Sequence, residues 1–148
     1  MSEWRELYQE LIIDHGKNPR NLKKLSDATH TKEGFNPLCG DRLIVYLKIV
    51  NNKIVESSFE GSGCAISTAS ASFMTEALKN KSLPEAQKIF DDFHAMVMGD
   101  KTSATETLGK LSVLQGVCEF PSRVKCATLA WHTMMATLNN TAGNVSTE

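Results

Sequence analysis

The sequence contains no long apolar run and no excess of charge of either sign. No apolar stretch approaches the roughly 20 residues that a membrane-spanning helix needs, and residues 2–14 mix charges into every turn, unlike a signal peptide. The 16 basic and 17 acidic residues give a net charge of -1. Apart from Lys23 and Lys24, the basic residues are scattered rather than gathered into a stripe. We therefore expect a cytoplasmic protein that binds neither a membrane nor nucleic acid.

Two motifs that would assign a chemistry directly are also absent. The segment Gly61-Ser62-Gly63 is not followed by the Lys and Ser or Thr of a phosphate-binding loop. The four cysteines form no Cys-x-x-Cys pair; they are Cys39, Cys64, Cys118 and Cys126. In a reducing compartment we expect these thiols to be ligands, nucleophiles or buried residues rather than disulfides.

The apolar content is sufficient for one hydrophobic core. The chain has 148 residues, of which 41% are hydrophobic, and this length favours a single domain. We assign that domain to residues 1–138. Residues 139–148 are polar without periodicity, which predicts a disordered tail.

Apolar residues recur at helical spacing in five segments, most weakly in the fourth. The segments are residues 4–12, 65–79, 82–99, 108–114 and 121–138. The pattern Ser82-Leu83-Pro84-Glu85 is typical of a capping box, and it predicts a helix that begins there. Cys64 and Cys126 are each predicted to lie near the N-terminal end of a helix.

Strands are predicted between the first two of these helices. Residues 42–50 and 53–60 are rich in β-branched and aromatic residues and flank Asn51-Asn52, which predicts a tight hairpin. Residues 17–41 are predicted to be mostly loop, with room for one short strand. The order of helix, strands and further helices predicts an α+β fold, with a small antiparallel sheet packed against several helices.

The stretch NPLCGDRL, residues 36–43, places a thiol close to a carboxylate. Asp41 is two residues beyond Cys39, so on extended backbone the two side chains leave the same side. Cysteine sulfur and aspartate oxygen are both zinc ligands, and three thiolates with one carboxylate would complete a tetrahedral site. A helix N-terminus offers partial positive charge and free N–H groups to the thiolates of Cys64 and Cys126.

Other interpretations of the same residues stay open on the pattern alone. Cys64 and Cys126 can be ordinary buried thiols, because free cysteine is among the most buried residue types. Asp41 can be a turn cap without a ligand role. Cys64 can be the nucleophile of a Cys-His hydrolase, although no family signature surrounds it. A zinc ion with a purely structural role is a further alternative.

Three stretches taken together resemble the U-type iron–sulfur cluster assembly proteins, the SufU and IscU family, over most of residues 2–138. These are NPLCGDRL, FEGSGCAISTASASFM and RVKCATLAW. The resemblance implies a SufU/IscU-like fold and a metal-binding set formed by Cys39, Asp41, Cys64 and Cys126. SufU-type members hold zinc in this set, whereas iron or a [2Fe-2S] cluster is the alternative. Cys118 matches none of the three motif cysteines.

Two features are similar to SufU rather than to IscU-type scaffolds. Lys125 stands where IscU-type scaffolds carry a histidine, and the stretch from about residue 100 to residue 121 is similar to the extra segment of SufU-type chains. The Leu-Pro-Pro-Val-Lys motif that chaperones recognise in IscU-type scaffolds is missing. We regard Arg123, one turn before Cys126, and Lys125 as supporting residues of the site.

The resemblance also implies a function. The protein would accept persulfide sulfur on Cys39 from a cysteine desulfurase of the SufS type and pass it towards cluster assembly and acceptor proteins. It would act as a sulfurtransferase-like accessory of that desulfurase rather than as an independent enzyme. The alternative is a scaffold on which the same ligands assemble a [2Fe-2S] cluster for transfer to apo-proteins.

Overall fold

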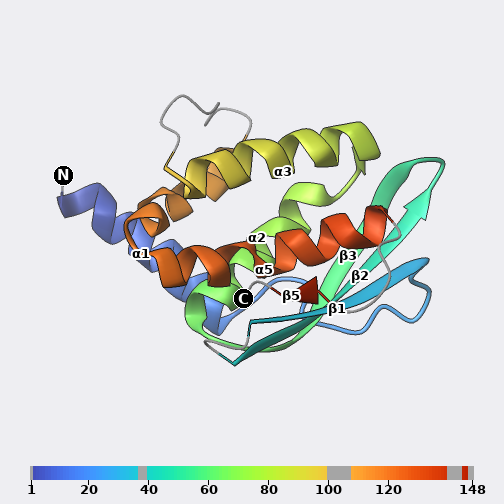
Figure 1. The fold of residues 1–148 in the computed structure, drawn as a ribbon, viewed down its shortest axis with the longest axis horizontal. Helices are drawn as coiled ribbons and strands as arrows, with labels where there is room; N and C mark the ends of the chain where they lie inside the picture. The colour runs from blue at the N-terminus through green and yellow to red at the C-terminus, as the bar shows by residue number, and fades with distance from the viewer. Residues whose placement is uncertain (1, 37–39, 100–107, 140–144, 147–148) are drawn as a thin grey trace.

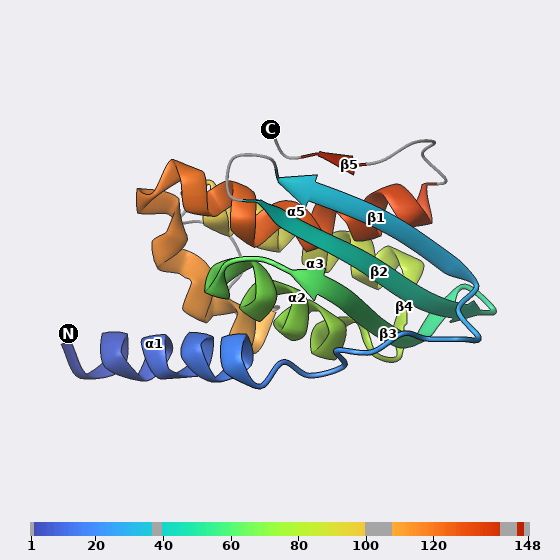
Figure 2. The ribbon, with the colours of Figure 1, turned by 90° about the horizontal axis from the view of Figure 1, so that it is seen from below.

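The computed structural model describes residues 2–36, 40–99, 108–139 and 145–146. It shows an α+β fold in which helices cover one face of a sheet (Figures 1 and 2). The fold class predicted from the sequence is confirmed. No helix in the described ranges is both long enough and apolar enough to cross a membrane.

The sheet has five strands in the order β4-β3-β2-β1-β5. Its centre is antiparallel and consists of β1 (His30–Asn36), β2 (Asp41–Val50) and β3 (Lys53–Ser62). Two-residue strands flank it: β4 (Lys81–Ser82) pairs antiparallel with β3, and β5 (Val145–Ser146) pairs parallel with β1. The short strand allowed for in residues 17–41 is therefore β1, which lies inside the sheet rather than at its edge.

The β2–β3 hairpin turns at the two asparagines that the sequence indicated. Asn51 and Asn52 have φ values of 53° and 61°, which asparagine tolerates better than most residues. The register pairs Leu43 with Gly61 and Arg42 with Ser62 at the far end of the hairpin. As a consequence, the end of β3 leads into the next helix beside the first residues of β2.

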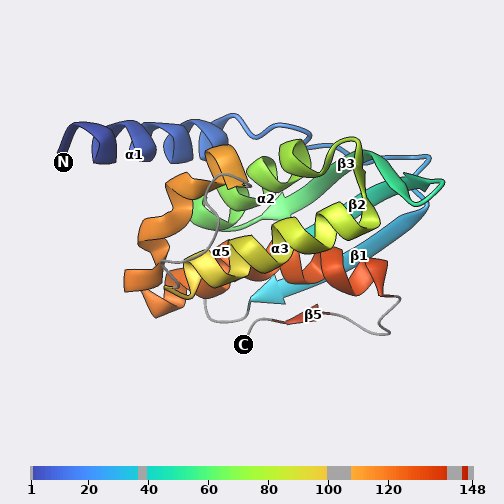
Figure 3. The ribbon, with the colours of Figure 1, turned by 90° about the horizontal axis from the view of Figure 1, so that it is seen from above.

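Within the described ranges, five helical segments account for most of the remaining residues. They are α1 (Ser2–Lys17), α2 (Ala65–Leu78), α3 (Leu83–Val97), the 3-10 helix η1 (Gly109–Glu119) and α5 (Pro121–Leu138). The Ser82–Glu85 capping box is present at the start of α3. The weak fourth periodicity corresponds to η1, which has tighter 3-10 geometry, carries two glycines and has no side-chain cap at its start. Figure 3 shows α3 on the side of α5 that faces away from the sheet.

The core joins the inner face of the sheet to α2 and α5. The side chains of Leu43, Val45 and Leu47 alternate along β2 and are completely buried. The indole N–H of Trp131 on α5 donates to the hydroxyl of Ser70 on α2 at 3.1 Å, and this hydroxyl donates to the Ala127 carbonyl at 2.5 Å. Because all these groups are buried, the two helices are held in one alignment along their length.

Helix α1 is attached to α2 by a buried histidine to which the sequence pattern gave no role. The His15 ring stacks on Phe73 with 3.8 Å between the centroids, and its Nδ1 lies 2.7 Å from the Ser72 hydroxyl. The backbone N–H of Arg20 donates to the same hydroxyl at 2.8 Å. The end of α1 and the loop after it are thereby held against the middle of α2.

The proposed division into a domain and a tail stays a prediction. Residues 140–144 and 147–148 lie outside the described residues, whereas Val145 and Ser146 pair with Gly34 and Phe35 of β1.

Gly34 of β1 lies close to α5, and this contact allows a test of the packing. A Cβ on Gly34 would overlap the Thr133 hydroxyl and lie 3.3 Å from a methyl group of Leu129. We expect Gly34→Ala to lower the free energy of unfolding by about 1–3 kcal/mol, because overpacking moves β1 away from α5. Gly116→Ala is the control, since no described atom lies within 4 Å of a Cβ there. Urea unfolding measures both, and equal stability of the two variants would contradict the packing argument.

Candidate metal centre

Three side chains with metal-ligating atoms converge at one end of the molecule. They belong to Asp41, Cys64 and Cys126, and their ligand atoms all lie within 4.8 Å of one another. Asp41 opens β2, Cys64 is the N-cap of α2, and Cys126 lies near the start of α5. Figure 2 shows that α2 and α5 both begin at this end. Among the described residues no other group of three or more His, Cys, Asp or Glu side chains has this geometry.

Asp41 points inward because of its position in β2. It shares the inner face with Leu43 and Val45, and only 1% of its surface is exposed. The extended backbone expected just before it is not present at Gly40, which has a φ of 72° and donates its N–H to the Asn36 carbonyl at 2.9 Å. The strand alternation, rather than the spacing from Cys39, therefore places this carboxylate at the site.

The two oxygens of the Asp41 carboxylate have different surroundings. Oδ1 accepts a hydrogen bond of 2.7 Å from the backbone N–H of Cys64. Oδ2 lies 4.0 Å from the Cys64 sulfur. A Cβ on Gly63 would lie 2.5 Å from Oδ1, so the absence of a side chain there makes room for the carboxylate. The carboxylate thus caps the start of α2 with one oxygen and presents the other to the sulfur cluster.

Cys64 combines the roles of helix cap and candidate ligand. Its sulfur accepts a hydrogen bond of 3.4 Å from the N–H of Ser67, as a capping side-chain oxygen does in other helices. The side chain is partly exposed, and the N-terminal end of the helix suits an anionic sulfur. The four histidines are all described and none belongs to the cluster, so the geometry does not support a Cys-His hydrolase at this position.

Cys126 is completely buried and lies beyond the first turn of α5. The favourable interaction of a helix N-terminus with an anion fades within that turn, so it stabilises a thiolate at Cys126 less than one at Cys64. A side-chain partner is present instead: the amide nitrogen Nδ2 of Asn36 lies 3.7 Å from the Cys126 sulfur. Asn36 opens the NPLCGDRL stretch, but only the strand register brings it to this site.

The two supporting residues have different positions. The negative charge of Cys64 and then that of Cys126, together with hydrogen bonds to both sulfurs, raise the pKa of Arg123. Its guanidinium is exposed and faces the cluster from the first turn of α5. For Lys125 the structure shows, among the described residues, no contact between its ammonium group and the three ligand side chains. Arg123 is three residues before Cys126 and therefore lies on the same face of α5, whereas Lys125 is adjacent to Cys126 and does not.

Two cysteines cannot be placed from the structure. Cys39 lies outside the described residues, so its assignment as a ligand and sulfur acceptor stays a prediction. Cys118 belongs to η1, and its side chain is likewise outside what the structure describes.

The donor set fits a zinc ion. Zinc binds thiolate sulfur at about 2.3 Å and carboxylate oxygen at about 2.0–2.2 Å in a tetrahedron, which puts ligand atoms about 3.3–3.8 Å apart. The three atoms, within 4.8 Å of one another, need only a small closure to reach these separations. Three ligands leave one position of the tetrahedron for a further group.

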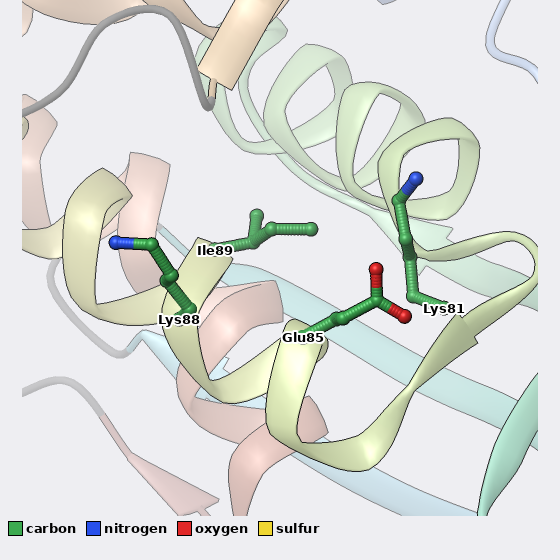
Figure 4. Close-up of a pocket in the computed structure, with 4 residues that line it drawn as sticks. All are labelled: Lys81, Glu85, Lys88 and Ile89. Atoms are coloured by element: carbon green, nitrogen blue, oxygen red, sulfur yellow. The ribbon is translucent and has the colours of Figure 1, made fainter.

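A surface pocket lies elsewhere, beside the start of α3, at the end of β3 remote from Cys64. It is lined by Lys81, Glu85, Lys88 and Ile89 (Figure 4). The Glu85 carboxylate already caps the Ser82 N–H at 3.0 Å, and the two lysine side chains diverge from each other. We assign this pocket no function.

Comparison with known proteins identifies the family. The model of the NifU-like N-terminal domain matches residues 7–127. A zinc-dependent sulfurtransferase, SufU, from Bacillus subtilis is 43% identical over 125 residues, which cover 84% of each chain. The iron–sulfur cluster assembly scaffold protein IscU from Streptococcus pyogenes is 39% identical over 142 residues, covering 96% of this chain and 89% of the relative.

A solved structure agrees with these relatives. A candidate scaffold for iron–sulfur cluster assembly in the SUF system, from Fervidobacterium islandicum AW-1, superposes with a TM-score of 0.84 at 35% identity. The superposition covers 90% of this chain and 98% of that one. The chain therefore belongs to the NifU-like N-terminal domain family, together with the SufU and IscU proteins of iron–sulfur cluster assembly.

Proposed function

We propose that this protein is a zinc-dependent sulfur acceptor that takes sulfur from the persulfide of a SufS-type cysteine desulfurase and passes it towards cluster assembly. The observation that carries the proposal is the convergence of Asp41, Cys64 and Cys126 within 4.8 Å. The 43% identity to a zinc-dependent sulfurtransferase supports it. Because the chemistry needs free thiols, we place the protein in the reducing cytoplasm.

We assign the zinc ligands to Asp41, Cys64 and Cys126, with Cys39 in the remaining position. Zinc, when bound, supplies a redox-inert positive charge that keeps the thiols deprotonated and ordered. Chain connectivity supports the fourth assignment. Cys39 is two residues from Asp41, so their α-carbons are at most about 7 Å apart.

The ends of the segment that carries Cys39 are fixed by the sheet. Asn36 and Asp41 are direct partners in the β1–β2 register, and the Gly40 N–H is bonded to the Asn36 carbonyl. Any position of the Cys39 side chain is thereby kept within a short distance of the cluster. These contacts of the flanking residues support the assignment of Cys39 to the centre.

The transfer step needs no oxidant or reductant. The Cys39 thiolate attacks the terminal sulfur of the desulfurase persulfide, and a new S–S bond forms on Cys39. The S–S bond of the desulfurase breaks, and its cysteine leaves as a thiolate. We propose that the exposed guanidinium of Arg123, which already interacts with two sulfurs, stabilises negative charge on sulfur during this exchange. Lys125 is a second candidate for contact with the partner.

A scaffold for a [2Fe-2S] cluster is the second candidate function. The 39% identity to the IscU of Streptococcus pyogenes over nearly the whole chain favours it. The same three side chains would then hold iron, which also accepts thiolate ligands. Lys125, where IscU-type scaffolds carry histidine, favours the sulfur acceptor instead.

Metal content separates these functions. We expect about one zinc per chain after purification without chelators or added metal, because thiolates and a carboxylate match zinc's preferences. Complete removal of the metal should lower the melting temperature, since the ligands come from β2, α2 and α5 and the ion ties them together. Elemental analysis and thermal unfolding measure both. Iron and sulfide in place of zinc would instead support the scaffold function.

Two substitutions separate the cap and ligand roles of Asp41. Asp41→Asn keeps an oxygen to accept the Cys64 N–H but removes the charge, whereas Asp41→Ala removes both. We expect both variants to bind zinc more weakly, and only Asp41→Ala to lose about 1 kcal/mol of stability in the metal-free protein. Competition with a chromogenic chelator and urea unfolding measure these effects. Asp27→Ala, which removes an exposed carboxylate paired with Lys48, is the control.

An unchanged zinc affinity in Asp41→Ala would limit this residue to a capping role.

Sulfur acceptance should depend on Cys39 and not on Cys118, which none of the three family motifs includes. We expect Cys39→Ser to abolish the transfer of labelled sulfur from the desulfurase, because the nucleophile is lost, and Cys118→Ser to retain it. The measurement is the location of the label by peptide mass spectrometry after incubation with desulfurase and labelled cysteine. Label on Cys118 in the unmodified protein would overturn the assignment.

A further inference from the structure

Asn36 is a buried polar side chain at the metal centre that the family motifs do not explain as a ligand. It ends β1, and only 1% of its surface is exposed. Its Nδ2 lies 3.7 Å from the sulfur of Cys126 in a geometry that donates an N–H hydrogen bond. An amide nitrogen with bound hydrogens is not a metal ligand, so its contribution to the centre must pass through the sulfur.

We propose that Asn36 is a positioning residue that holds the Cys126 sulfur in the centre as a weakly reactive thiolate, so that sulfur chemistry is directed away from Cys126. This inference rests on the proposed metal centre. It adds different roles for two of the ligands: Cys126 stays bound to the metal, whereas Cys39 leaves it to accept sulfur.

The position of Asn36 is fixed from both sides. In the β1–β2 register it lies directly opposite Asp41, and direct partners of an antiparallel pair project from the same face of the sheet. Its carbonyl accepts the Gly40 N–H. Two residues earlier, Gly34 packs closely against Thr133 of α5. The strand therefore presents Asn36 to the same helix that carries Cys126.

The surroundings of the two described sulfurs differ in a way that supports different reactivities. Cys126 is completely buried and receives the Asn36 amide. Cys64 is partly exposed and receives the backbone N–H of Ser67. A hydrogen bond to a thiolate draws electron density from the sulfur and lowers its nucleophilicity, and both sulfurs receive one. The difference between them is burial, which excludes electrophiles from Cys126 and not from Cys64.

The first test uses the unmodified protein. With ¹¹³Cd in the centre and ¹⁵N-labelled asparagine, the hydrogen bond predicts a scalar coupling between a side-chain amide proton of Asn36 and the cadmium, transmitted through the Cys126 sulfur. A spectrum with assigned Asn36 amide protons and no such coupling would overturn the proposal. This measurement does not depend on the folding of any variant.

The second test compares Asn36→Leu, which has similar volume and no donor, with Thr137→Val. Thr137 is buried like Asn36 but lies on α5, remote from Cys126. Its hydroxyl donates to the Thr133 carbonyl at 2.9 Å. In the cobalt-loaded protein we expect Asn36→Leu to shift the sulfur-to-cobalt charge-transfer absorption to lower energy. In the zinc-loaded protein we expect alkylation of Cys126 to accelerate about fivefold, the factor that corresponds to one lost hydrogen bond.

The alkylation rate is measured by mass spectrometry of the Cys126 peptide, with the Cys64 peptide as internal reference. Thr137→Val should change neither the absorption energy nor the alkylation rate.

The outcomes distinguish this inference from the proposed function. If the unmodified protein binds cobalt without sulfur charge-transfer bands, the metal centre itself is wrong. If the bands are present and Asn36→Leu changes neither their energy nor the reactivity of Cys126, only the role of Asn36 is wrong.

Discussion

The hydrogen bond between the Asp41 carboxylate and the Cys64 N–H joins the sheet to the first turn of α2. Only 1% of Asp41 is exposed, and a carboxylate buried to this extent without a partner would be costly. The bond therefore fixes where α2 starts relative to β2. Gly63 allows the approach because it has no side chain in the space that the carboxylate occupies. One contact thus satisfies a buried charge, caps a helix and brings two candidate ligands together.

The position of Cys126, the third candidate ligand, depends on the alignment of α5 with α2. The hydrogen bonds from Trp131 to Ser70 and from Ser70 to the Ala127 carbonyl hold the two helices side by side in the core. Cys126 immediately precedes Ala127, so this alignment also fixes the position of the Cys126 sulfur relative to the start of α2. The candidate metal centre is consequently built on two helices and a strand that are fixed by core packing, which is the rigid support that a preorganised site needs.

Local patterns in the sequence correctly predicted most of the secondary structure. The Asn51-Asn52 turn and the Ser82 capping box depend on contacts between neighbouring residues, and both are present. The sequence placed β1 less well, because residues 30–36 have no clear alternation and the strand is stabilised by pairing with β2 and packing against α5. The tight 3-10 geometry of η1 was likewise not evident, since weak helical periodicity does not distinguish a 3-10 helix from an α-helix.

The amino-acid sequence alone indicated which residue types could form a centre and which family the chain resembles. The motifs around Cys39, Cys64 and Cys126, together with Asp41, specify thiolates and a carboxylate suited to zinc, since ligand chemistry is a property of the side chain. The folded structure was needed to show that the two oxygens of the Asp41 carboxylate have different partners, that Arg123 faces the sulfurs whereas Lys125 does not contact them, and that Asn36 lies against Cys126. These facts depend on strand register and helix alignment, which arise from contacts between residues up to 90 positions apart, and no local pattern encodes them.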